Sequence, residues 1–269
     1  MKAGRTLAAA YASAAYGFLY LPIAVLVIYS FNRDGVGGFP PRHWTLDWYR
    51  TLFADSAMWT AVGNSAIVAF STVVLSMLIG FPAAYALDRY SFPGKGAFQR
   101  LVLLPLIVPG VITGISLLLL TVSSGLHLSL VTVILGHSTA LTAVATTEIF
   151  AGFAKLDRSL EEASADLGAS RLQTLLRIIL PGLRTSMLGT ALLIFTLSMD
   201  EIAVTFFLIG RENTLPLEIW SRLRRGATPE MNAIATLIFL FSVITIFMSQ
   251  WLITRGQAGT SFAQEGITT

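Results

Sequence analysis

Long apolar runs recur along this 269-residue chain, and they constrain its fold more than any other feature. A helix needs about 20 apolar residues to cross the hydrocarbon layer of a membrane. Because the backbone of such a segment must satisfy its own hydrogen bonds in lipid, each run predicts a membrane-spanning α-helix. We therefore expect an all-α, polytopic membrane protein with about six transmembrane helices. The six runs are Leu7–Phe31, Met58–Leu87, Leu101–Val122, Leu128–Phe150, Leu183–Ile209 and Met231–Ile253.

Composition supports a membrane protein and excludes several other classes. Only 12% of the residues are charged, whereas soluble domains have about 25%. The net charge of +3 comes from basic residues spread among the loops, which does not indicate a nucleic-acid partner. The chain has no cysteine, so it has neither disulfides nor thiolate chemistry.

The distribution of Lys and Arg predicts the orientation in the membrane, because cytoplasmic loops carry the excess of positive charge. With the amino terminus inside, eleven of the 18 basic residues lie inside and seven outside. We expect both termini in the cytoplasm. A cluster at Arg222, Arg224 and Arg225, just before the last apolar run, opposes this orientation. The first run starts like a signal peptide but has no clear cleavage site, so we interpret it as a retained helix.

This topology divides the chain into three parts. Residues 1–57 form the first transmembrane helix and an external loop, with Trp44 and Trp48 as interfacial anchors. Residues 58–253 form the transmembrane core, which includes a polar segment at residues 152–182. Residues 254–269 form a polar cytoplasmic tail.

The segment Glu161–Pro181 is the most informative stretch, because it is too polar to cross the membrane and lies between two spans on the inner side. Its apolar residues recur at helical spacing, Gly168 interrupts the pattern, and Pro181 is expected to end it. This pattern predicts two short amphipathic helices bent at Gly168. Such a pair either lies on the membrane surface or docks into a groove of a partner protein.

The sequence of this segment resembles the EAA loop of ABC importer permeases. The matching positions are Glu162, Ala163, Gly168, Ile178 and Leu180-Pro181, while Ser164 replaces the usual alanine. In that family the loop is the coupling helix that docks into a cytoplasmic ATPase. The resemblance therefore implies an ATPase-coupling role for a set of residues in this segment. The set is Glu161, Glu162, Ala163, Ser164, Asp166, Leu167, Gly168 and Pro181.

Other stretches resemble the spermidine/putrescine-type branch of the same permeases, and they extend the resemblance to nearly the whole chain. The branch places residues 214–236 on the outer side, which accounts for the arginine cluster there. The stretches are LLPLIVPGVITGISLLL at 103–119, LGHS at 135–138, LSMDEIAVTFFLIG at 197–210 and TLPLEIWSRLRRGATPEMNAIAT at 214–236.

The resemblance implies a complex in a bacterial cytoplasmic (inner) membrane. Its expected partners are a second, homologous permease subunit, two cytoplasmic ATPase subunits, a periplasmic or extracellular substrate-binding protein, and membrane lipid. The sequence has no Walker-type glycine loop, so we expect ATP and Mg on the partner ATPase and no cofactor on this chain. It also has no recognisable catalytic set or zinc-like cluster, so we predict a transport subunit and not an enzyme.

Acidic residues within apolar runs are functional candidates because charge is costly at membrane depth. Asp200 and Glu201 lie near the middle of the fifth run and suit a polyamine cation, so we expect them on the substrate pathway. Alternatively, one satisfies a buried backbone or arginine partner and the other stabilises the interface with the paired subunit. We expect structural roles for Glu148 and for His137, which has no second metal ligand at suitable spacing. Pro105, Pro109 and nearby glycines interrupt the third run. The carbonyl groups freed there either line a path or allow the run to bend, or these residues only pack there.

These features predict a permease subunit that moves polyamines by alternating access, driven by ATP hydrolysis on partner subunits. One alternative is the same type of importer for another small solute, such as an amino-acid-like compound, another amine or ferric iron. A second is a proton-coupled secondary transporter that uses Glu148, Asp200 or Glu201. A third is an intramembrane enzyme or a purely structural subunit. Only the ATP-driven importers need the docking segment.

Overall fold

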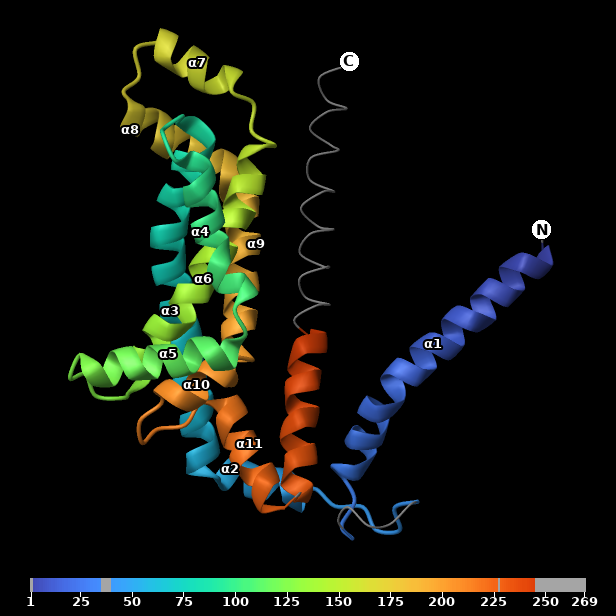
Figure 1. Ribbon diagram of the computed structural model, residues 1–269. Helices are drawn as coiled ribbons and strands as arrows, with labels where there is room; N and C mark the ends of the chain where they lie inside the picture. The colour runs from blue at the N-terminus through green and yellow to red at the C-terminus, as the bar shows by residue number, and fades with distance from the viewer. Residues whose placement is uncertain (1, 35–39, 227, 245–269) are drawn as a thin grey trace. The chain divides into compact units, whose positions relative to one another are not determined.

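The computed structural model describes residues 2–34, 40–226 and 228–244 (Figure 1). These residues are almost entirely helical, and their only β-structure is an isolated bridge between Asn32 and Trp44. The all-α prediction is therefore confirmed. The chain divides into two compact units, one made of residues 1–56 and 221–269 and the other of residues 57–220.

The first unit contains α1 (Lys2–Tyr29), α2 (Asp47–Ala54), the end of α11 (Leu215–Arg225) and an apolar helix at Pro229–Ile244. Polar side chains fold the loop after α1 onto α2. The indole Nε1 of Trp48 donates to the carbonyl oxygen of Asn32 at 2.8 Å, and the hydroxyls of Ser30 and Tyr49 are 2.7 Å apart. Asp55 forms an ion pair with Arg222, so part of the arginine cluster stabilises this unit. The predicted tail, 254–269, lies outside the described residues.

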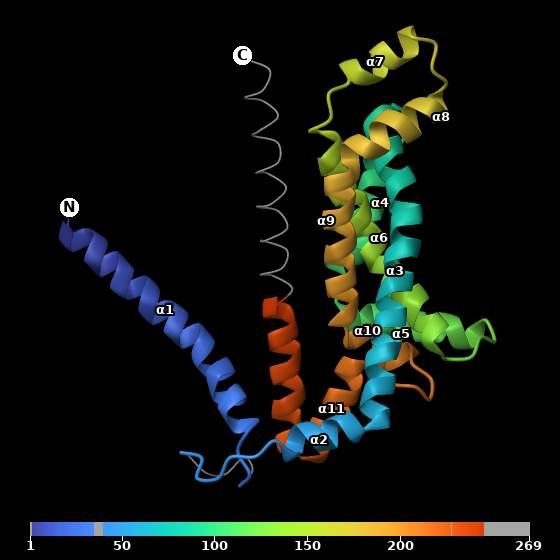
Figure 2. The ribbon, with the colours of Figure 1, turned by 180° about the vertical axis from the view of Figure 1, so that it is seen from behind.

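Three long helices run side by side in the second unit: α3 (Ser56–Arg89), α6 (Leu130–Phe153) and α9 (Leu180–Met199) (Figures 1 and 2). Their contacts use small residues, as is usual where membrane helices approach closely. A side chain at Gly80 of α3 would overlap Ala145 of α6, and one at Gly152 of α6 would come within 2.9 Å of Ser186 of α9. The glycines therefore set the close spacing of this bundle.

The third predicted span, Leu101–Val122, is broken into α4 (Lys95–Ile107) and α5 (Gly110–Ser123), which meet at 102°. A residue before proline is driven into extended backbone, and Val108, before Pro109, has ψ 127°. The bend allows α5 to pack against α10 (Ala203–Leu208) and α6. A side chain at Gly114 would lie only 2.6 Å from the ring of Phe207, so glycine permits this close contact.

The fifth predicted span, Leu183–Ile209, is wrong at both ends. The helix begins earlier, because α8 (Arg171–Thr174), a π-helical turn (Leu175–Ile179) and α9 form one apolar rod, Arg171–Met199. Pro181 does not end it. Proline at the start of α9 cannot donate a helical hydrogen bond, and the widened turn before it accommodates this loss. The rod ends at Met199, and α10 follows as a separate short helix.

Four helices of the described part of the chain are long and apolar enough to cross a membrane, and a fifth is obtained if the bent pair is one span. The helix at Pro229–Ile244 is shorter, and the predicted run Met231–Ile253 extends beyond the described residues. The chain is therefore a multi-pass membrane protein. Six spans remains a prediction.

Candidate coupling segment and membrane path

The predicted coupling segment folds as two short helices, α7 (Ser159–Asp166) and α8, which lie at one end of the α3–α6–α9 bundle (Figure 1). Asp157 starts the segment by accepting a hydrogen bond from the Ser159 backbone N–H at 3.0 Å. This bond lowers the pKa of the Asp157 carboxyl below its ordinary value. Gly168 turns the chain between the helices with φ +80°, a conformation that favours glycine. The bend predicted at Gly168 is therefore present.

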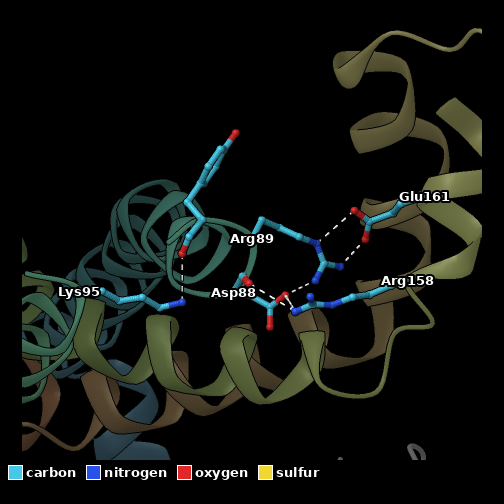
Figure 3. Close-up of polar contacts among 6 residues, drawn as sticks. Asp88, Arg89, Lys95, Arg158 and Glu161 are labelled. Carbon is cyan, nitrogen blue, oxygen red and sulfur yellow. Dashed lines mark hydrogen bonds and ion pairs between the residues drawn. The ribbon is translucent and has the colours of Figure 1, made fainter. Parts of the chain in front are cut away.

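Some of the predicted coupling residues contact the rest of this chain, and the others are exposed on its surface. Glu161 is turned toward the bundle, where it forms an ion pair with Arg89 of α3 (Figure 3). Ser164 is buried, and its Oγ lies 2.9 Å from Oγ1 of Thr174, so it joins α7 to the beginning of the rod. The hydroxyl thus gives this departure from alanine a structural role that the local sequence does not indicate. The outward-facing, exposed residues are Glu162, Ala163, Asp166, Leu167 and Gly168.

Several apolar side chains of the coupling segment and of the start of the rod are exposed. Leu167, at the end of α7, is 89% exposed, and Leu160 and Leu172 are at least half exposed. A hollow of about 340 Å³ lies beside Leu167, lined by residues that include Ser164, Gly168 and Arg177. An exposed apolar side chain beside a hollow suits contact with a partner protein. Pro181 lies apart from it, within the first turn of α9.

Asp200 and Glu201 lie in the break between α9 and α10 and not in the middle of a helix, which corrects their predicted placement. The Oε1 atom of Glu201 accepts a hydrogen bond from the Val204 N–H at 2.9 Å, so this carboxylate caps α10. Asp200 is exposed in the chain. The two acids therefore differ: one is engaged in holding the break, and the other presents its carboxylate at the surface of the unit.

His137 of α6 contacts the chain on both sides of the break between α9 and α10. Its Nδ1 lies 2.8 Å from the Ser198 hydroxyl and its Nε2 lies 2.8 Å from the Thr205 hydroxyl. The imidazole is buried, and its two partners stand on either side of the acidic pair. The structural role predicted for His137 is confirmed. Glu148 is exposed on α6.

Replacing His137 with leucine should lower the stability of the protein by about 1–3 kcal/mol, because the buried Ser198 hydroxyl would lose its contact with the imidazole and the Thr205 hydroxyl would keep only its bond to the Glu201 carbonyl among the described residues. The measurement is the free energy of unfolding in detergent. Ser138→Ala is a matched control on the same helix, since the Ser138 hydroxyl donates to the Ile134 carbonyl within that helix and not to the break. Equal stability of the His137→Leu and Ser138→Ala proteins would show that the imidazole does not hold the break.

The fold and this site together define a class of protein. It is a polytopic helical membrane subunit with a bent pair of helices, residues 159–179, at one end of its bundle, and we call this bent pair the elbow. Comparison with known proteins specifies the family. Residues 73–255 match the family described as binding-protein-dependent transport system inner membrane component, and the chain belongs to this family. It is therefore a multi-pass permease subunit of a transport system, and the resemblance read from residues 161–181 is confirmed.

Two relatives are similar over nearly the full length. The putrescine transport system permease protein PotI of Escherichia coli K12 is 37% identical over 250 residues, which is 90% of this chain and 89% of that protein. The spermidine/putrescine transport system permease protein PotC of Haemophilus influenzae is 36% identical over 241 residues, 89% of this chain and 93% of that protein.

Solved structures support the fold. A bacterial ABC transporter involved in the import of the acidic polysaccharide alginate has a chain that superposes with a TM-score of 0.71 at 16% identity, covering 94% of this chain and 96% of that one. A chain of the MetNI methionine ABC transporter superposes with a TM-score of 0.58 at 16% identity, covering 74% of this chain and 95% of that one. This fold therefore occurs in transporters of chemically different solutes.

Proposed function

We propose that this chain is a permease subunit of an ATP-binding-cassette importer for polyamines such as putrescine and spermidine. The observation that carries the proposal is the 36–37% identity to permeases of putrescine and spermidine/putrescine transport systems over about nine-tenths of the chain. The fold alone does not specify the solute, because the alginate importer shares it.

The exposed carboxylate of Asp200 supports a cationic substrate. A polyamine carries several ammonium groups, and each must exchange water for polar or anionic groups along a membrane path. Asp200 stands at a helix break, where the backbone is irregular, and such breaks in membrane proteins line cavities or are buried in protein. We assign Asp200 to the pathway and Glu201 both to the pathway and to the cap of α10.

The coupling segment supports energy input from a partner. ATP binding would close two cytoplasmic ATPase subunits, and each ATPase would receive one elbow such as residues 159–179 in a cleft. Leu167, with its nearly complete exposure, is the apolar anchor of this contact. Movement of the elbow would rock the helices around a path completed by a second, homologous permease subunit.

The remaining assignments follow from this architecture. ATP and Mg belong to the ATPase subunits, and this chain carries no cofactor in the proposal. A periplasmic or extracellular binding protein delivers the solute, as a periplasmic protein is seen in complex with the bacterial alginate transporter. The coupling segment faces the cytoplasm of a bacterial cell, and both termini lie on that side of the inner membrane.

The test is reconstitution of the complete complex in proteoliposomes, with the ATPase, second permease and binding protein from the same genome. Labelled putrescine and spermidine should accumulate only when ATP is supplied on the side of the coupling segment. Sulfate and methionine serve as control solutes and should not accumulate. Uptake driven by a proton gradient without the ATPase would contradict the proposal, as would preferred accumulation of either control solute.

A further inference from the structure

Arg89, at the carboxyl end of α3, joins that helix to α7 (Figure 3). Its Nε donates to Oε2 of Glu161 at 3.1 Å, and its Nη2 donates to Oε1 of the same carboxylate. Two parallel bonds between a planar guanidinium and a carboxylate fix orientation as well as distance. The first turn of α7 is therefore held in a defined direction relative to the end of α3.

The surroundings strengthen this pair. Nη1 of Arg89 also donates to Asp88, which in turn accepts from Arg158 at 3.2 Å. The guanidinium carbon lies 5.0 Å from the centre of the Phe153 ring, at the end of α6. The side chains of Arg89 and Glu161 are only 10% and 19% exposed. Because water has limited access, solvent screens these charges less than it screens a surface pair.

The elbow is connected to the bundle through the backbone and through side chains. Along the backbone, α7 follows α6 through residues 154–158 and leads through Gly168 and α8 into the rod that ends as α9, with the Ser164–Thr174 contact beside it. Through side chains, Glu161 pairs with Arg89 and Arg158 pairs with Asp88, and both of these partners belong to a different helix, α3. The covalent path alone would let α7 move without moving the end of α3.

We infer that Arg89 is a positioning residue that transmits displacement of α7 to α3 through Glu161. This inference rests on the proposed function, because a docked ATPase is what displaces α7. It also divides the two neighbouring glutamates by role: Glu161 points to the bundle and serves transmission within the chain, while Glu162 is exposed and available to the partner. The division is specific to these positions, since both residues carry the same side chain.

A double-mutant cycle tests the pair. The variants are Arg89→Gln, Glu161→Gln and both together, each assembled in the complete complex. The readout is the number of putrescine molecules imported per ATP hydrolysed, normalised to assembled complex. Each single variant should lower this ratio about tenfold, and the double variant should lower it no further, because the effects of residues in contact are not additive.

Lys95→Gln is the matched control, because Lys95 donates to the Tyr90 backbone carbonyl and lies outside the ion-pair cluster (Figure 3). This control should leave the ratio unchanged.

A cross-linking experiment distinguishes transmission from stability. This chain has no natural cysteine, so Arg89→Cys combined with Glu161→Cys gives it a single thiol pair, and the wild-type complex treated with the same reagent controls for thiols of the partner subunits. This variant should hydrolyse ATP with little import. A short, reducible bifunctional thiol reagent should restore import per ATP, and reduction should abolish it again, because the tether replaces the lost ion pair.

The possible outcomes separate the inference from the proposed function. The inference would be overturned if the losses of the two single variants add in the double variant. It would also be overturned if the variants lower the amount of assembled complex but leave the number of putrescine molecules imported per ATP unchanged. Either result leaves the importer assignment standing. Failure of the tether to restore import would overturn it as well. A wild-type complex that imports no putrescine on ATP addition would instead reject the proposed function.

Discussion

Replacing Gly168 with valine should abolish ATP-driven import while the protein still inserts in the membrane. Gly168 has φ +80°, and an L-residue in this conformation costs about 1–2 kcal/mol, with a branched side chain at the high end. Apart from its two chain neighbours, no described residue lies within 4 Å of the position a Cβ would take, so the fold has room for the side chain. The substitution should therefore reduce import by changing the direction of the turn and the surface that contacts the ATPase. The measurements are the import of labelled putrescine and the basal ATP hydrolysis of the complex.

Gly94 offers a matched control for this experiment. It lies in the turn before α4, has φ +83°, and also has open space around its Cβ position. Gly94→Val thus introduces the same backbone strain outside the coupling segment. We expect it to retain most of the import activity. Equal loss of import in both variants would mean that strain alone is responsible, and normal import by Gly168→Val would remove this residue from the coupling contact.

Replacing Asp200 with asparagine should reduce the rate of polyamine import about 10- to 100-fold, because a hydrogen bond to a charged group contributes about 1.5–3 kcal/mol. The amide has nearly the same size, so assembly and basal ATP hydrolysis should change much less. Initial rates of putrescine import over a range of concentrations measure the effect. Glu201→Gln should also weaken import, but less, because the amide oxygen still accepts from the Val204 N–H and keeps the cap of α10.

Glu148→Gln is the charge-loss control for this series. Glu148 is also an exposed acidic residue of an apolar stretch, but it lies within α6 and not in the break between α9 and α10. Its neutralisation should leave the import rate close to that of the natural protein. Unchanged import kinetics in both the Asp200 and Glu201 variants would exclude them from the pathway and support a role at the interface with the second permease.

Much of the function could be predicted from the sequence because its signals are local. Runs of apolar residues are recognised one at a time, and the bend at Gly168 follows from a glycine that interrupts an amphipathic pattern. The resemblance to the EAA loop uses residues within about 20 positions of one another. Local spacing was therefore sufficient for the fold class, the family and the position of the elbow.

Helix ends were less predictable, because they depend on what the freed backbone groups contact. The continuous span expected through Asp200 ends at Met199, since Glu201 caps a new helix and His137 of α6 ties both sides of the break together. Pro181 was expected to end a helix and instead follows a π turn inside one. Neither result follows from hydropathy, which measures how well a segment suits lipid and not where its hydrogen bonds go.

The sequence by itself determined that the chain crosses a membrane several times, that it belongs among binding-protein-dependent permeases, and that an amphipathic elbow lies near Gly168. Only the tertiary structure decided that Glu161 faces Arg89 while Glu162 faces outward. The physical reason is that Arg89 and Glu161 are 72 residues apart in the chain. Such a pair forms only when the packing of α3 against α6 has already brought their ends together, and no local pattern encodes that distance.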